Sequence, residues 1–332
     1  RNTAAIFLGS TIGCAECHDH KYDPFTQRDF YSFAAFFADL KEPGVGHPGE
    51  TPIPSKVQLE KWQALETQLA SLRKENPKSE RIKVVEGELK QISDAKNWPK
   101  MVITIPGKAR DIRILSRGNW QDDSGPVVNP AIPAFLGSLQ VKGRATRLDL
   151  AKWIVSDDNP LTSRVFVNRL WKLLFGRGLS QTLDDLGAQG QWPTHPELLD
   201  WLAVEFIESG WNVRHMVKLI VMTDAYRRSS TPTADQRKLD PENRYFARQA
   251  RWRLEAEFVR DNALAVSGLL SRKSGGPSVR PYQPANYWFR LYKDAKYNQD
   301  HGENLYRRGL YTYWRRSFWH PSLRAFDAPA RE

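Results

Sequence analysis

The chain has 332 residues, which is too long for a small disulfide-stapled module and long enough to bury a substantial core. Its mean hydropathy of −0.58 and the lack of any run of about 18 apolar residues argue against a transmembrane segment in this chain. The net charge of +11 favours anionic partners, but the basic residues are interleaved with acidic ones and no zinc-finger or RNA-binding signature occurs, which argues against sequence-specific nucleic-acid binding.

The two cysteines of the chain, Cys14 and Cys17, lie in the sequence GCAECHDHK at residues 13–21. Cys-x-x-Cys-His is the attachment pattern of c-type haem, in which two thiols add to the haem vinyl groups and the next residue binds the iron. The spacing therefore predicts haem c held by Cys14 and Cys17, with His18 as the ligand of the haem iron. His20 is too close to His18 to reach the opposite haem face, and we expect it to contact a propionate or act as a further metal ligand.

Three other interpretations fit the same cysteines. Zinc could be bound by Cys14, Cys17 and two histidines, because tetrahedral zinc accepts mixed thiolate and imidazole sets. A thioredoxin-like redox pair would follow a strand, which residues 4–9 could supply. A structural disulfide, or two buried thiols, is the fourth possibility. If haem c is correct, the protein is exported to the periplasm or cell surface, because covalent haem attachment takes place outside the bacterial cytoplasm. The chain begins with Arg1 and shows no signal peptide, so we expect a processed or truncated piece.

The first part of the chain alternates between helix and strand signals. Thr26 is the predicted N-cap of a helix over residues 27–40, and a loop rich in Gly and Pro follows at 43–54. Apolar residues at helical spacing predict a projecting helical hairpin over 55–96. β-Branched residues over 102–105 and 112–115 favour two strands of a small β unit. We therefore expect a haem-motif domain at 1–120 and an extended linker at 121–145.

The remainder of the chain is predicted to be a helical domain at 146–332. A period of 3.6 residues recurs in five segments, which are 147–155, 162–175, 196–209, 213–226 and 251–270. The fold class is therefore mainly α, with helical domains, a helical hairpin and a small β unit.

Twelve aromatic residues lie between Tyr282 and Trp319, interleaved with arginines. Aromatic faces and guanidinium groups suit sugar rings that carry sulfate or carboxylate, although the same pattern is typical of an aromatic core. The candidate substrate-binding residues are Trp288, Arg307, Arg308, Trp314, Arg315 and Trp319. The candidate catalytic residues are His195 at a helix start, His320 and Asp327.

Several separate motifs together resemble one family. They are CAECHDHKYDP at 14–24, NPLT at 159–162, VNRLW at 167–171, FGRG at 175–178, HPELLDW at 195–201, RLEAE at 253–257 and FDAP at 326–329. In this order they closely resemble the planctomycete-type paired domains of unknown function that accompany planctomycete cytochrome c domains in large exported proteins. The resemblance covers nearly the whole chain, implies export and haem, and leaves the reaction open.

These observations predict an exported c-type haem protein that transfers electrons, coupled to oxidation of an anionic polysaccharide and working with an electron donor or acceptor protein. One alternative is a zinc-stabilised, non-redox binding or scaffold protein of the cell surface. The other is a polysaccharide hydrolase or lyase in which the haem or metal is structural.

Overall fold

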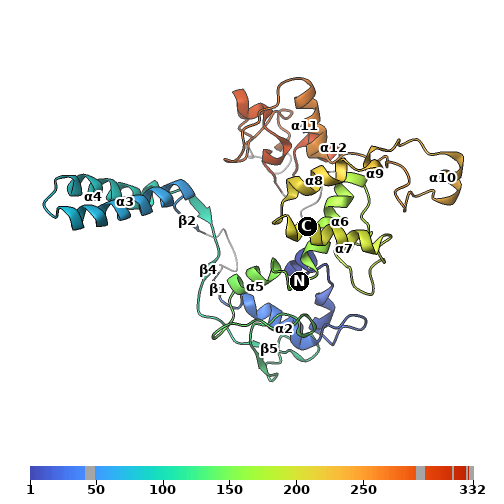
Figure 1. Cartoon of the computed structure of the whole chain (residues 1–332), viewed down its shortest axis with the longest axis horizontal. Helices are drawn as coiled ribbons and strands as arrows, with labels where there is room; N and C mark the ends of the chain where they lie inside the picture. The colour runs from blue at the N-terminus through green and yellow to red at the C-terminus, as the bar shows by residue number, and fades with distance from the viewer. Residues whose placement is uncertain (42–48, 289–295, 316–317, 327, 329–332) are drawn as a thin grey trace. The chain divides into compact units, whose positions relative to one another are not determined.

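A computed structural model describes residues 1–41, 49–288, 296–315, 318–326 and 328 (Figure 1). The chain forms two compact units, an N-terminal unit over 1–222 and a C-terminal unit over 223–332. The described part is mainly helical with small two-stranded sheets, which confirms the predicted fold class. The segment 121–145, predicted to be a linker between domains, lies within the N-terminal unit. No described helix has both the length and the apolar character needed to cross a membrane.

The N-terminal unit begins with α1 (Asn2–Phe7) and the 3-10 turn η1 (Ile12–Glu16), followed by α2 (Gln27–Ala34) and η2 (Ala35–Phe37). Helix α2 starts where predicted, because the Thr26 hydroxyl accepts from the Asp29 N–H and the Asp29 carboxylate accepts from the Thr26 N–H. Residues 4–7, offered above as part of a strand, belong to helix α1, whose alanines favour helix. The strand that a thioredoxin-like pair requires is therefore not there.

The hydrophobic core of this region joins α1, η1 and α2 to α5 (Arg147–Ile154). Its largest buried members are Leu8, Ile12, Phe25, Phe33, Phe36, Ile132, Leu150, Trp153 and Ile154. The turn that carries both cysteines is thus built directly on the core.

The predicted helical hairpin consists of α3 (Lys56–Glu75) and α4 (Arg81–Ser93), which lie side by side in Figure 1. Among its described residues only Leu65 and Val85 are fully buried. An ion pair of 2.8 Å between Arg73 Nη2 and Glu86 Oε1 also joins the two helices. Because so few of their side chains are buried, the two helices are stabilised mainly by contact with each other.

Three antiparallel strand pairs make up the small β unit. β1 (Leu40–Lys41) pairs with β4 (Ile105–Pro106), β2 (Glu50–Pro52) with β3 (Lys100–Val102), and β5 (Ile112–Arg113) with β6 (Val127–Val128). The short 3-10 turns η3 (Ala95–Asn97), η4 (Ser116–Gly118) and η5 (Ala134–Leu136) lie among them. The two predicted strand segments therefore pair with other parts of the chain rather than with each other.

The rest of the N-terminal unit is formed by α6 (Thr162–Phe175), α7 (Pro196–Glu208) and α8 (Val213–Val221). The rings of Phe166 and Phe206 stack with their centroids 4.6 Å apart, which fixes α6 against α7. The helix predicted over 213–226 is interrupted, because Thr223 starts a new helix by accepting from the Tyr226 N–H.

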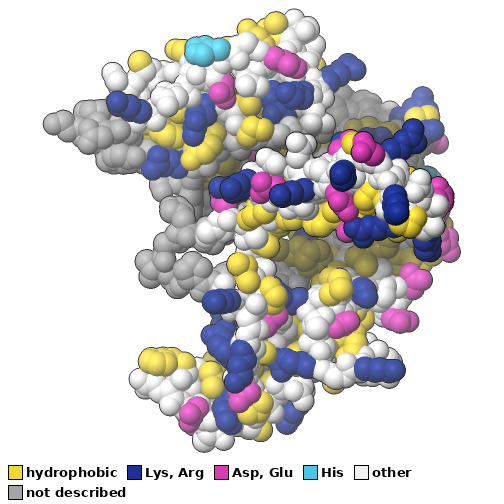
Figure 2. All heavy atoms as spheres, turned by 90° about the vertical axis from the view of Figure 1, so that its left-hand side faces the viewer, with side chains coloured by type: hydrophobic (Ala, Val, Ile, Leu, Met, Phe, Trp, Pro, Cys, Tyr) yellow, Lys and Arg dark blue, Asp and Glu magenta, His cyan; other side chains and the backbone are white. Residues whose placement is uncertain are grey.

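The C-terminal unit contains short helices connected by irregular chain. They are α9 (Asp224–Arg227), α10 (Ala234–Leu239), α11 (Ala256–Val266), η7 (Gly302–Tyr306), η8 (Gly309–Tyr311) and α12 (Pro321–Ala325). A small core of Ala256, Leu323 and Ala328 packs with Trp314. On the face drawn in Figure 2, basic side chains are interspersed with acidic and apolar ones instead of forming one continuous patch.

Candidate functional site

The two cysteines lie on the exposed side of the turn η1. Ile12 and Ala15 of this turn are 1% and 0% exposed and anchor it to the core. In a 3-10 helix, residues three apart lie on the same side, and Cys17 directly continues the turn with helical dihedral angles. Cys14 and Cys17 therefore present their thiols on one side, and neither forms a disulfide.

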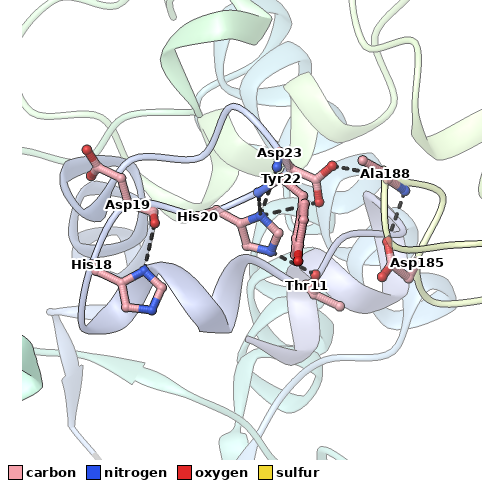
Figure 3. Close-up of polar contacts among 9 residues, drawn as sticks. Thr11, His18, Asp19, His20, Tyr22, Asp23, Asp185 and Ala188 are labelled. Atoms are coloured by element: carbon pink, nitrogen blue, oxygen red, sulfur yellow. Dashed lines mark hydrogen bonds and ion pairs between the residues drawn. The ribbon is translucent and has the colours of Figure 1, made fainter.

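His18 is exposed beside the cysteines and is held in one orientation. Its Nδ1 lies 2.7 Å from the carbonyl oxygen of Asp19 (Figure 3). A carbonyl can only accept a hydrogen bond, so Nδ1 carries the proton and donates. The lone pair is then on Nε2, which is the tautomer in which imidazole binds a metal through Nε2.

His20 has the opposite environment. Its ring is buried, and Nδ1 accepts from the N–H of Asp23 at 2.9 Å and lies 3.3 Å from the N of Tyr22. Nε2 consequently carries the proton and donates to Thr11 Oγ1 at 3.2 Å. Both ring nitrogens are used inside the fold, so His20 could serve as the predicted metal ligand only by giving up these contacts.

The backbone at Gly118 packs against the second cysteine. Gly118 has a φ of +72°, and a Cβ at this position would lie 2.9 Å from Cys17 Sγ. Only a glycine therefore fits here without displacing this thiol. Two exposed unpaired thiols and an imidazole with a free Nε2 are the donor set that c-type haem requires, so these residues fit haem. Among the residues that the structure describes, no three His, Cys, Asp or Glu side chains are grouped to bind a metal ion.

A buried carboxylate connects the cysteine motif to a loop far along the chain. Asp23 Oδ1 accepts from the N–H of Ala188 at 2.7 Å, and Asp23 Oδ2 lies 3.5 Å from His20 Nδ1 (Figure 3). Gly187 packs on this carboxylate so closely that a Cβ there would lie 2.5 Å from Oδ2. Asp185 in turn accepts from the Gly187 N–H at 2.9 Å. This contact was not predicted from the sequence.

The three predicted catalytic residues fall in different parts of the chain. His195 is the N-cap of α7 in the N-terminal unit, and its Nδ1 lies 3.1 Å from Thr194 Oγ1. His320 is the N-cap of α12 in the C-terminal unit. Asp327 lies outside the described residues.

His320 is buried and fastens two segments of the C-terminal unit together. Its Nε2 lies 2.8 Å from the carbonyl oxygen of Tyr282 and donates to it, while Nδ1 lies 2.8 Å from Ser322 Oγ. Burial is the main cause that lowers the pKa of His320 below 6.5; Arg260 lowers it further, and the hydrogen bond to Tyr282 opposes both. The ring is therefore held neutral.

We expect His320 to stay neutral in mildly acidic solution. Because its folded-state pKa is below that of the unfolded chain, its contribution to stability is complete above pH about 6.5 and is lost as the pH falls through the folded-state value. Imidazole carbon–proton NMR shifts, with the resonance assigned through His320→Asn, would measure this. A pKa of His320 at or above that of a histidine in a short unfolded peptide would contradict the prediction.

The arginines predicted to bind an anionic substrate are engaged within the C-terminal unit. Arg307 is 2% exposed and donates to the carbonyl oxygens of Lys273, Gly275 and Pro277, with its guanidinium over the Tyr311 ring. These contacts hold the loop around 273–277.

Of the other predicted substrate-binding residues, Arg308 is exposed, Trp314, Arg315 and Trp319 are half-buried, and Trp288 is buried at 8% exposure. Arg308 Nε donates to Asp261 Oδ2 at 3.0 Å. The guanidinium of Arg315 lies 4.9 Å from the ring centroid of Trp288, and Trp314 stacks with Trp319 at 5.5 Å. A cavity of about 590 Å³ borders Trp288 and is lined by residues 282–288 and 296–299. Aromatic packing and a cavity thus occur in the same segment.

Matches to two family models identify this helix-rich chain as of the planctomycete cytochrome c-associated type. The family model of PSD1, a protein of unknown function (DUF1553), matches residues 146–332, more than half of the chain. The model of PSCyt2, a protein of unknown function (DUF1549), matches residues 1–42. The chain belongs to the DUF1553 family, and the two matches together confirm the predicted resemblance. No curated protein and no solved structure matched the chain.

Proposed function

We propose that this chain is an exported c-type haem protein that transfers electrons, with the haem held by Cys14, Cys17 and His18. The observation that supports the proposal is the hydrogen bond from His18 Nδ1 to the Asp19 carbonyl, beside two exposed unpaired thiols. This bond selects the tautomer of His18 that can bind iron through Nε2 before any haem is present. Covalent haem attachment outside the cytoplasm supports export to the periplasm or cell surface.

The chain holds these groups through the N-terminus of α2. Asp19 Oδ1 accepts from the Gln27 N–H at 2.7 Å, so the residue whose carbonyl orients His18 is itself fixed. The Gln27 amide donates to the carbonyls of Glu16 and Leu115, which fixes the end of the cysteine turn. When bound, haem c supplies a one-electron redox couple. The role of the protein is to attach it and to orient the iron ligand.

We further propose that electron transfer is coupled to oxidation of an anionic polysaccharide, with a separate protein as electron donor or acceptor. The support for a saccharide site is the cavity beside Trp288, whose described lining combines the aromatic residues Tyr287 and Tyr297 with the cationic Lys296. A cationic side chain next to aromatic faces suits a sugar that carries carboxylate or sulfate.

The first experiment is a visible spectrum of the chain produced with a c-type haem maturation system. We expect a c-type α-band after reduction with dithionite, and a pyridine haemochrome that remains with the protein after acid-acetone extraction. A colourless protein with stoichiometric zinc would refute the redox proposal and favour a scaffold. In a second arm, oxidised protein is mixed anaerobically with oligogalacturonate or chondroitin sulfate. Reduction of the haem supports the coupling, whereas product formed without any electron acceptor indicates a hydrolase or lyase.

A further inference from the structure

A second cavity of about 610 Å³ lies in the N-terminal unit, within the usual size range of ligand sites. Its wall is the loop 186–193, and the starts of α6 and α7 complete it. This cavity contains none of the residues proposed above to hold haem or an anionic sugar.

The loop that forms the wall is fixed by the fold. Ala188, which lines the cavity, donates to the buried carboxylate of Asp23. Gly190 approaches the backbone of Asp185 so closely that a Cβ would lie 2.0 Å from its carbonyl oxygen. Because these contacts hold the loop in one conformation, the cavity is largely formed before any ligand binds.

The lining has an apolar floor and a large exposed ring. Leu161, Leu186 and Leu199 form the floor, and Leu199 is only 3% exposed. The indole of Trp192, by contrast, is 82% exposed beside this floor. An exposed tryptophan on a fixed loop, next to a preformed cavity, provides a flat apolar surface on which a ligand can stack.

The polar groups of the cavity carry no net charge. Of the described residues that line it, Arg164 and Asp200 are the charged ones, and Arg164 Nε donates to Asp200 Oδ1 at 2.6 Å. Arg164 Nη1 donates to the Pro160 carbonyl at 2.5 Å, so this guanidinium is already engaged. An anionic ligand would have to compete with Asp200 for Arg164, which disfavours phosphate, sulfate or carboxylate groups.

The same polar groups suit hydroxyls. Asp200 can accept, the side-chain amide of Gln191 can both donate and accept, and Arg164 can donate through Nη2, which neither of these two contacts uses. A hydroxyl group can both donate and accept a hydrogen bond. A sugar ring, with hydroxyls around an apolar face, therefore matches this mixture of donors and acceptors. We propose that the cavity bordered by Trp192 binds an uncharged sugar, with a pyranose ring stacked on the indole and its hydroxyls bonded to Asp200, Arg164 and Gln191.

The test measures binding of neutral hexasaccharides of glucose, mannose and xylose to the full chain by isothermal titration calorimetry. We expect at least one of them to bind, and Trp192→Ala to weaken that binding by about tenfold or more, since a stacked aromatic contact is lost. Trp192→Tyr, which keeps a ring, should retain part of the affinity. Trp120→Ala is the matched control, because Trp120 is 80% exposed and does not line the cavity.

Three results would overturn the proposal. They are the absence of binding by every neutral sugar tested, equal affinity of the Trp192→Ala and Trp120→Ala proteins, and binding confined to oligogalacturonate or chondroitin sulfate. Affinity for a neutral sugar should also stay constant as salt is raised, because no net charge is neutralised on binding. Haem content is measured separately on each variant, so failure of this proposal is distinguishable from failure of the proposed haem function.

Discussion

The double substitution Cys14→Ser and Cys17→Ser is expected to abolish covalent haem completely, because a serine hydroxyl does not replace the thiolate that adds to the vinyl groups. The fold should persist, since both side chains are exposed and form no disulfide. Haem staining after denaturing electrophoresis measures attachment, and thermal unfolding followed by circular dichroism measures the fold. Each single substitution should leave at most one thioether and a visibly altered haemochrome spectrum.

Replacement of the neighbouring histidine separates attachment from iron binding. His18→Ala should keep both thioether bonds and change the spectrum and reduction potential, because the iron loses its ligand while the thiols remain. His301→Ala is the control, since His301 is also exposed but lies in the C-terminal unit. If the spectrum and potential of His18→Ala equal those of the unmodified protein, His18 is not the iron ligand.

Gly187→Ala is expected to lower the free energy of unfolding by about 3 kcal/mol, which combines overpacking with the loss of a buried hydrogen bond. The added methyl group would lie 2.5 Å from Asp23 Oδ2 and would push this carboxylate away from the Ala188 N–H. Denaturant unfolding measures the change. Gly87→Ala is the control, because a Cβ there meets no atom within 4 Å and alanine in helix α4 should stabilise the chain by about 0.5–1 kcal/mol.

A double-mutant cycle shows whether contact with Asp23 causes the destabilisation by Gly187→Ala. In an Asp23→Ala background the methyl group of Gly187→Ala has space, so its cost should fall by more than about 1 kcal/mol. If the two substitutions add without coupling, the effect comes from the backbone of the loop and not from contact with Asp23.

Local features of the sequence predicted where several of the helices lie. The range of α6 matches its apolar period and its C-terminal glycine, since Gly176 adopts the left-handed conformation that ends the helix. Thr26 predicted the start of α2, but the helix ends at Ala34 and Leu40 lies in β1, so the predicted range 27–40 was too long. The break between α8 and α9 was missed because the apolar period continues through Thr223, whose side chain nevertheless caps a new helix.

Contacts between distant residues could not be predicted from one sequence. Asp23 and Ala188 are 165 positions apart, and Asp23-Pro24 is equally typical of an ordinary turn. Nor does the sequence show that Arg307 is buried, because an arginine among aromatic residues suits a binding surface as well as a core. One weak sequence signal pointed to the cavity bordered by Trp192. This residue is an isolated tryptophan between Gln191 and Pro193, in a loop rich in Gly and Pro.

The bond between Asp23 and Ala188 also bears on how these sequences evolve. Asp23 lies in the stretch matched by DUF1549, and Ala188 lies in the stretch matched by DUF1553. One hydrogen bond to a buried carboxylate therefore joins the two matched stretches. Each stretch would leave a desolvated polar group without its partner if it were transferred to another gene alone. We therefore expect the two stretches to be inherited as a pair, and we expect the hairpin of α3 and α4, in which few residues are buried, to tolerate changes of length.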